Sequence, residues 1–297
     1  MKKKRLSLQQ KHSLTGLLYT LPWIIGFAYF FFVPLIKSFI YSLSSIKMGK
    51  GGFELTWVGF ENYRNTFVKD PDNMRMILSS IGNVVVTVIV VVVFSMFIAI
   101  ILNQKFVGRS VARVIFALPI IISSGVIIVL LKENVLQQNL GSTETATTIF
   151  QGNGVLDFLR NVGIPEEIVG FFEGLVNDVF DMVWRSGMQI ILFLSALQSI
   201  PSSAYEAAKI EGATAWESFW FVTFPTVSPF LLVNIIYTII DTFTDSTNKV
   251  MREIFTLVSE IEYERAASLS IVYFILVLAV VGIVYAIMKN RINYAEK

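Results

Sequence analysis

Side chains that commonly do covalent chemistry are scarce in this sequence. The 297 residues contain no cysteine and one histidine, His12. Neither an H-E-x-x-H nor a G-x-S-x-G pattern occurs, so the usual marks of a metallohydrolase or a serine hydrolase are absent. The G-x-x-x-x-G-K-[ST] loop that cradles nucleotide phosphates is absent as well. The sequence therefore predicts no catalytic residue, no metal site and no cofactor in this chain.

Polar residues inside long apolar stretches offer a different chemistry, the reversible binding of a polar solute. Such residues are costly in hydrocarbon and tend to face a cavity. The alternative is that they join helices to one another or reach the membrane surface, and the sequence leaves both possibilities open. The candidates for a solute path are Asn83, Trp184, Arg185, Gln189, Asn234, Tyr237 and Asp241.

The elements that position these residues follow from the composition. Hydrophobic residues make up 54% of the chain, charged residues only 15%, and the mean hydropathy is +0.65. A soluble domain has about 25% charged residues, so we expect an all-α membrane protein. Six stretches suit spanning helices of about 20 residues: 14–36, 84–102, 114–131, 182–200, 225–245 and 266–288. We interpret the first as a retained helix because it is longer than a signal-peptide core.

Basic residues predict the orientation. With the N-terminus inside the cell, the inner segments hold 12 Lys and Arg in 60 residues, against 10 in 106 residues outside. Both termini are therefore predicted to be cytoplasmic, in a single transmembrane domain over 1–297. Residues 132–181 would form a short external helical insertion, although a plain solvated loop is also compatible with their composition. Residues 201–225 would form a cytoplasmic loop.

This cytoplasmic loop has a pattern of its own. Ser203 with Glu206, and Thr214 with Glu217, have the S/T-x-x-E spacing of capping boxes, which predicts two short helices. Gly212 lies between them and suits a left-handed stop. Pro225 should end the second helix. The loop is rich in aromatic side chains for an exposed segment, so some should pack on the membrane core and others could meet a partner.

The same loop resembles the EAA loop of ABC-importer permeases, whose pattern is EAA, three residues, Gly, nine residues, then I-x-L-P. Here Glu206–Ala208 precedes Gly212 at that spacing, and nine further residues lead to Val222, Phe224 and Pro225. Val and Phe stand where the family has Ile and Leu. The sugar-importer branch usually reads EAA-x-I-D-G-A, and this chain has Glu211 in place of the Asp.

The resemblance to carbohydrate permeases extends over nearly the whole chain. Trp57–Tyr63 looks like their external G-L-x-N-Y segment, Gly108–Pro119 like G-R-x-x-F-R…L-P, and Leu197–Pro201 like the lead-in to the EAA loop. The family often has a G-G-P element after the fifth span, which Asp241–Asn248 lacks. The class of substrate is therefore less firmly implied than the family.

The resemblance implies the type I permease fold of an ABC importer. One of two permease subunits, in the bacterial plasma membrane, would form a path for a sugar or oligosaccharide delivered by an extracellular binding protein. Two separate ATPase subunits would hold ATP and Mg, and no nucleic acid is involved. The alternatives are a permease for an amino acid, peptide or phosphate, or a secondary transporter. The residues that would contact the ATPase are Glu206, Ala207, Ala208, Glu211, Gly212 and Ala213, with Glu206 making a charged contact.

Overall fold

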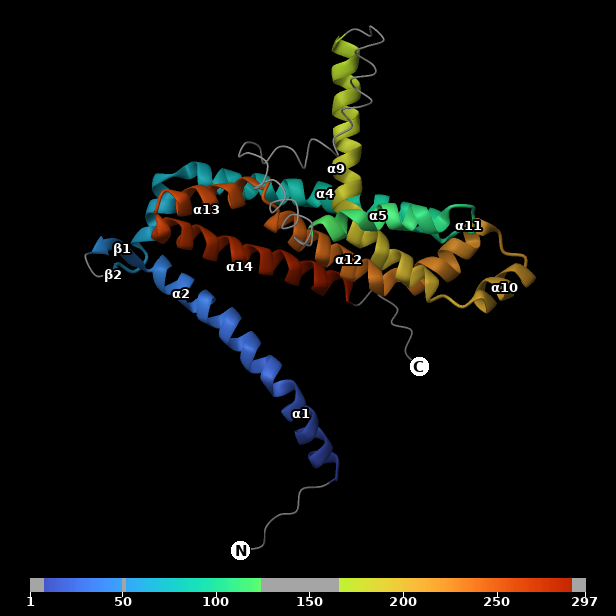
Figure 1. Cartoon of the computed structure of the whole chain (residues 1–297), viewed down its shortest axis with the longest axis horizontal. Helices are drawn as coiled ribbons and strands as arrows, with labels where there is room; N and C mark the ends of the chain where they lie inside the picture. Colours follow the sequence, from blue (N-terminus) through green and yellow to red (C-terminus); the bar gives the residue numbers. More distant parts are fainter. Residues whose placement is uncertain (1–7, 50–51, 124–165, 290–297) are drawn as a thin grey trace, which may run out of the picture. The chain divides into compact units, whose positions relative to one another are not determined.

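The computed structural model describes residues 8–49, 52–123 and 166–289 (Figure 1). The chain divides into two compact units. The first comprises Met1–Gly82 and Phe243–Val280, and the second comprises Asn83–Thr242 and Val281–Lys297. Three helices take part in both units, α4 (Pro71–Asn103), α12 (Phe224–Thr244) and α14 (Tyr263–Met288).

Long apolar helices account for the membrane character of the chain. Four described helical stretches are long and apolar enough to cross a membrane, namely Thr15–Ser42, Pro71–Asn103, Ala215–Ser259 and Tyr263–Met288. Large apolar side chains remain open on them, for example Val86 on α4 and Ile275 on α14. Water would disfavour such contiguous apolar surface, whereas a bilayer covers it. The prediction of a helical membrane protein is confirmed in this coarse form.

The finer prediction of six spans is only partly covered by the described residues. The first stretch lies within α1 (Leu8–Phe27), η1 (Ala28–Phe32) and α2 (Val33–Ser42). Helices α4, α12 and α14 run through the second, fifth and sixth stretches. Helix α5 (Arg109–Ser123) contains the start of the third, and α9 (Glu166–Gln198) contains most of the fourth. The remainder of 114–131 and most of the insertion 132–181 lie outside the described residues, and the end of that insertion belongs to α9.

The first unit contains a β-hairpin that the all-α prediction lacked. Strands β1 (Ser44–Gly49) and β2 (Gly52–Trp57) pair antiparallel, with Ser44 opposite Trp57. The hairpin is closed at its base by Asn62, whose amide Nδ2 donates to the carbonyls of Ser42 and Ser44 at 3.0 and 2.9 Å. The Asn–Tyr pair of the 57–63 segment thus joins α2 to the hairpin and to α3 (Glu61–Arg64), because Tyr63 also hydrogen-bonds the Ser42 hydroxyl.

A buried hydrogen-bond network joins four helices at the first unit: α4, α12, α13 (Lys249–Ser259) and α14. Asn248 Nδ2 donates to the Ser80 hydroxyl on α4 at 2.8 Å, and Ser80 lies 3.3 Å from the Tyr273 hydroxyl on α14. Tyr273 in turn donates to the carbonyl of Phe243 at 3.0 Å. Asn248 Oδ1 also accepts from the Val250 N–H and so caps α13. Buried polar groups in apolar surroundings need such partners, which fixes the helices in register.

Wide helical turns precede three of the prolines. The π-helical segments η1, η2 (Asn65–Lys69) and η3 (Phe219–Thr223) each end two residues before a proline, at Pro34, Pro71 and Pro225. Proline lacks an N–H, and its ring clashes with the carbonyl four residues earlier, which in each case lies inside the π segment. The prediction that Pro225 ends a helix is therefore wrong, because the wider turn lets η3 continue into α12.

The second unit is built on α9. Phe193, Ala196 and Leu197 are buried on this helix, and Val227 and Ile239 are buried on α12. Helix α5 packs on α9. Arg113 on α5 donates through Nε and an Nη to the carbonyl of Leu102 near the end of α4, at 3.3 and 3.0 Å. These contacts hold α5 against α9 and against the end of α4, next to the loop that follows α9.

The Asn248 network gives a test of the first unit. Changing Asn248 to Ala removes a helix cap and a buried hydrogen bond, each of which contributes about 1 kcal/mol. We expect thermal unfolding of the protein in detergent to occur several degrees lower. Asn248→Asp keeps the capping oxygen and loses the donor to Ser80, so it should lower the unfolding temperature by less. Equal unfolding temperatures for wild type and Asn248→Ala would contradict this role.

Candidate functional site

The loop between α9 and α12 is built from two short helices and a glycine turn. Helix α10 (Ser202–Ile210) is followed by Gly212, which has φ of 81°, and then by α11 (Ala215–Ser218). The N–H of Gly212 donates to the Lys209 carbonyl and that of Ala213 to the Ala208 carbonyl. This pair of bonds is the Schellman pattern that ends a helix in a left-handed residue. The predicted glycine turn is confirmed.

The two capping boxes have different outcomes. Thr214 and Glu217 form one: Glu217 N–H donates to the Thr214 hydroxyl, and the Glu217 carboxylate accepts from Thr214 N–H at 2.8 Å. Hydrogen bonds from the Thr214 backbone and hydroxyl lower the pKa of the exposed Glu217 carboxyl below its usual value. The predicted box of Ser203 with Glu206 is wrong. Helix α10 begins at Ser202, its N-cap is Pro201, and no side chain caps it.

Most of the predicted coupling residues are exposed. Glu206, Ala207, Glu211 and Gly212 are exposed, whereas Ala208 and Ala213 are half-buried. A Cβ added at Gly212 would meet no atom within 4 Å, so any cost of a substitution there comes from the positive φ rather than from crowding. Large apolar side chains in the same loop are open, with exposures of 87% for Ile210 and 79% for Phe221.

A notch of about 380 Å³ lies beside these residues. Ala207, Ala208 and Ala213 line it, and their small side chains leave it open. Glu211, Glu217 and Phe221 also line it. The arrangement can therefore receive a side chain of another protein, with carboxylates and an aromatic ring at hand. A solvated loop with no partner would have little reason to expose Ile210 and Phe221 together.

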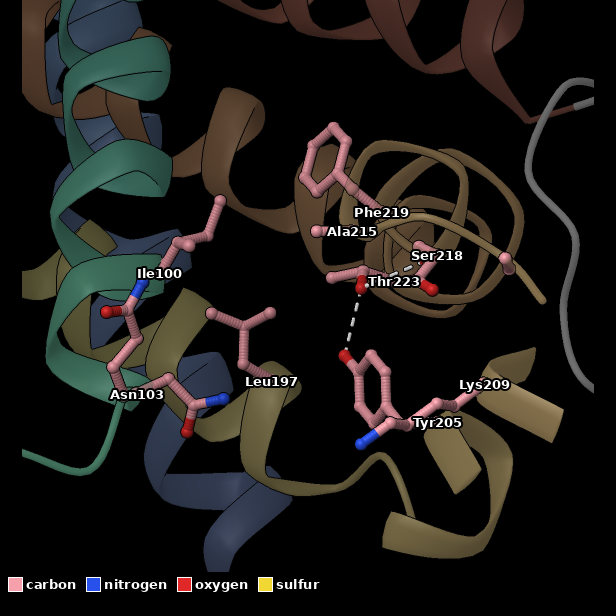
Figure 2. A pocket seen from close by; sticks show the side chains of 11 residues that line it. Ile100, Asn103, Leu197, Tyr205, Lys209, Ala215, Ser218, Phe219 and Thr223 are labelled. Carbon is pink, nitrogen blue, oxygen red and sulfur yellow. Dashed lines mark hydrogen bonds between the residues drawn. The ribbon is translucent and has the colours of Figure 1, made fainter. Parts of the chain in front are cut away.

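A larger cavity of about 520 Å³ separates this loop from the end of α4 (Figure 2). Ile100 and Asn103 of α4, Leu197 of α9, and Tyr205 and Thr223 line it. Tyr205 on α10 lies at the edge of the cavity, and its hydroxyl lies 2.9 Å from the Thr223 hydroxyl on η3. This link was not predicted. Thr223 lies 18 residues after Tyr205, and no local pattern in the sequence pairs two hydroxyl groups at that distance.

The solute-path candidates are distributed over three helices of the second unit. Asn234, Tyr237 and Asp241 share a stripe of α12, since they are three or four residues apart. Gln189 on α9 faces that stripe, and its Nε2 donates to the Thr238 hydroxyl at 3.1 Å. Trp184 and Arg185 lie on the same helix, one turn before Gln189, and are partly exposed. Asn83 on α4 is exposed, and no described contact joins it to the others.

Two buried amides in this group have unused hydrogen-bonding atoms. Gln189 and Asn234 are both fully buried. Gln189 Oε1 and both polar atoms of the Asn234 side chain have no hydrogen-bond partner. Unsatisfied buried amides are costly, each by roughly 1–3 kcal/mol. The interface between α9 and α12 is therefore polar and incompletely satisfied, unlike the apolar core around Phe193.

The chain is similar to known transport proteins over most of its length. Residues 182–294 match the family described as "Binding-protein-dependent transport system inner membrane component". The "Probable ABC transporter permease protein YesP" of Bacillus subtilis is 29% identical over 80% of this chain and 73% of its own length. The "Arabinooligosaccharides transport system permease protein AraP" of the same organism is 30% identical over 71% of this chain and 63% of its own length.

A solved structure agrees on the fold. A chain from the crystal structure of a bacterial alginate ABC transporter, in complex with its alginate pentasaccharide-bound periplasmic protein, superposes with a TM-score of 0.64. The superposition covers 94% of this chain and 96% of the other, at 19% sequence identity. The family match includes the loop 201–225 and helix α12. Residues 182–294 therefore match the inner membrane component of binding-protein-dependent transport systems, and the chain as a whole is similar to proteins named as ABC transporter permeases.

Proposed function

We propose that this chain is one of two permease subunits that carry a sugar or oligosaccharide into a bacterial cell across the plasma membrane. An extracellular binding protein delivers the solute, and two ATPase subunits, which hold ATP and Mg²⁺, drive the transport. The observation that carries this proposal is the exposed loop surface of Glu206, Ala207, Glu211 and Gly212. It has the spacing of a coupling loop and no buried residue in α10 or α11.

The geometry of the loop supports docking on another protein. A groove on an ATPase subunit can approach the backbone closely at Ala207 and Gly212, where side chains are small. Glu206 is exposed and free to meet a basic side chain. Because η3 joins α11 to α12 without a break, force applied to the loop reaches the membrane through a continuous helix. The sequence has no phosphate-binding loop, which supports ATP hydrolysis by partner subunits rather than by this chain.

A sugar is the solute that the polar path favours. Related permeases are named for arabinooligosaccharides, and the similar crystal structure holds an alginate pentasaccharide on its periplasmic protein. The proposed path joins the aromatic side chains Trp184 and Tyr237 to the charged groups of Arg185 and Asp241, with Asn83 nearer the start of α4. Sugars use such aromatic faces and hydrogen-bonding groups together. Gln189 and Asn234 would join the path when α9 and α12 separate, because both are buried in this state and Gln189 bonds to Thr238 of α12.

Partner subunits give the first test. The purified chain alone should hydrolyse no ATP, whereas the chain expressed with its full set of partner genes should co-purify with an ATPase and a second permease. Vesicles containing that complex should take up a labelled sugar from a panel of arabinooligosaccharides and alginate oligosaccharides, only with ATP and the binding protein. ATP hydrolysis by the single chain, or uptake that an ion gradient drives without ATP, would refute the proposal.

The loop surface gives the second test. Gly212→Asp introduces a side chain at positive φ, at a cost of roughly 1–2 kcal/mol, and adds a charge to the docking surface. We expect normal abundance in the membrane, weak ATPase co-purification and loss of uptake. Glu206→Lys should do the same without backbone strain.

Gly108→Asp is the matched control for Gly212→Asp. Gly108 also has a positive φ, of 90°, and open space around it, but lies in the α4–α5 connection. It should therefore suffer the same strain and keep most ATPase binding. Equal loss in both glycine variants would mean that strain, rather than docking, explains the result.

Orientation gives the third test, since the chain has no cysteine of its own. Single cysteines at Ser246, after α12, and at Ser110, in α5, both replace exposed residues. An impermeant thiol reagent added to intact cells should label position 246 and leave position 110 unlabelled until the cells are opened. The opposite pattern would invert the proposed topology.

A further inference from the structure

Helix α10 is held to the rest of the second unit by few contacts. It has no buried residue, and its last residue, Ile210, is 87% exposed. Among the described residues, one side-chain hydrogen bond links α10 to another element, and it joins Tyr205 to Thr223. A short helix with so little packing would move freely if nothing else fixed it. The Tyr205 hydrogen bond is therefore the main side-chain contact that fixes α10, in addition to its chain connections to α9 and α11.

The partner of Tyr205 is firmly placed. Thr223 is buried, 6% exposed, at the end of η3. Its hydroxyl also donates to the Ser218 carbonyl five residues earlier, at 3.4 Å. With that proton used, the Thr223 oxygen accepts from the Tyr205 O–H. The result is a chain of two hydrogen bonds from α10 to the backbone of the wide turn before Pro225.

The cavity beside this link leaves room for movement. Its volume of about 520 Å³ lies between α10 and the end of α4, so α10 does not rest against α4 there (Figure 2). Figure 2 shows the Tyr205 side chain at the edge of this space, with its hydroxyl directed at Thr223. Because α10 has open space beside it, it can change its angle relative to α4. The Tyr205–Thr223 hydrogen bond then ties any such movement of α10 to η3.

We propose that Tyr205 is a positioning residue for energy coupling: its hydrogen bond to Thr223 makes α10 and the loop end of α12 move as one body. The inference rests on the proposed function, because it assigns how movement of the docked loop enters the membrane. Tyr205 would not contact ATP, the solute or the ATPase. Its hydroxyl would decide how much of the loop's displacement reaches α12, and how much is lost as independent motion of α10.

The test measures the distance between α10 and α12 in the complete complex in lipid nanodiscs. Spin labels are placed on cysteines at Ser203 and Val233, both exposed, with cysteines of the partner subunits replaced. In the wild-type background we expect one narrow distance distribution that stays the same when ATP and vanadate trap the closed state. In Tyr205→Phe, which removes only a hydroxyl, the distribution should broaden or shift on trapping. Sugar uptake per ATP hydrolysed should fall roughly 2- to 10-fold, the range for one net hydrogen bond.

Matched variants separate positioning from folding. Thr223→Val should reproduce Tyr205→Phe, the double variant should be no worse than either, and Thr223→Ser should restore the narrow distribution. Thr226→Val is the control, because the Thr226 hydroxyl donates to the Val222 carbonyl four residues earlier, at 2.7 Å, along the continuous helix of η3 and α12, and makes no described hydrogen bond to α10. The proposal would be overturned if Tyr205→Phe left the distance distribution unchanged, or if Thr226→Val changed it equally. It would also be overturned if Tyr205→Phe lowered the abundance of the protein while Thr223→Val kept normal distances. Failure of the proposed function would appear separately, as a wild-type chain that binds no ATPase.

Discussion

A backbone that crosses hydrocarbon has to satisfy its N–H and C=O groups within its own helix, and prolines are the points where that requirement is hardest to meet. At Pro34 and Pro225 the chain meets it with a wide π turn that keeps the helix continuous. At Pro225 this has a consequence beyond local geometry. The helix runs from α11 through η3 into α12, so the loop that carries Gly212 joins the membrane part without a flexible linker. A rigid connection of this kind is what a subunit driven by another protein needs.

The two ends of this rigid connection differ in chemistry. At the loop end, small residues and an exposed glutamate leave the backbone open to a partner, and one hydrogen bond from Tyr205 holds α10 against the wide turn. Within the span, Thr238 of α12 accepts a hydrogen bond from Gln189 of α9, and the buried amides of Gln189 and Asn234 are not fully satisfied. Fully satisfied polar networks rigidify a core, whereas an unpaired buried polar group is costly. Under the proposed function, a polar solute could supply the missing hydrogen-bond partners of Gln189 and Asn234 if movement of α12 separated it from α9.

Local patterns in the sequence predicted local structure well. The Gly212 turn and the Thr214–Glu217 capping box follow from residues a few positions apart, and both formed. The Ser203–Glu206 box failed because Pro201 already occupies the N-cap, so Ser203 lies inside the helix. The hairpin was not predicted, although Gly49 and Gly52, which pair at its end, are residues typical of turns. Tertiary pairs such as Tyr205 with Thr223, or Gln189 with Thr238, could not be predicted, because nothing in the sequence says which distant side chains meet.

We propose that a separate ATPase acts on this chain at the loop between α9 and α12. Site-specific cross-linking in native membranes can show which protein lies against that loop. A photoreactive group attached to a single cysteine at Ile210, an exposed residue of the loop, should cross-link to an ATP-hydrolysing subunit. The same group at Phe60, also exposed but before α3 in the first unit, should not. Cross-linking of the ATPase from position 60 and not from position 210, or from neither position in a complex that transports, would contradict the account.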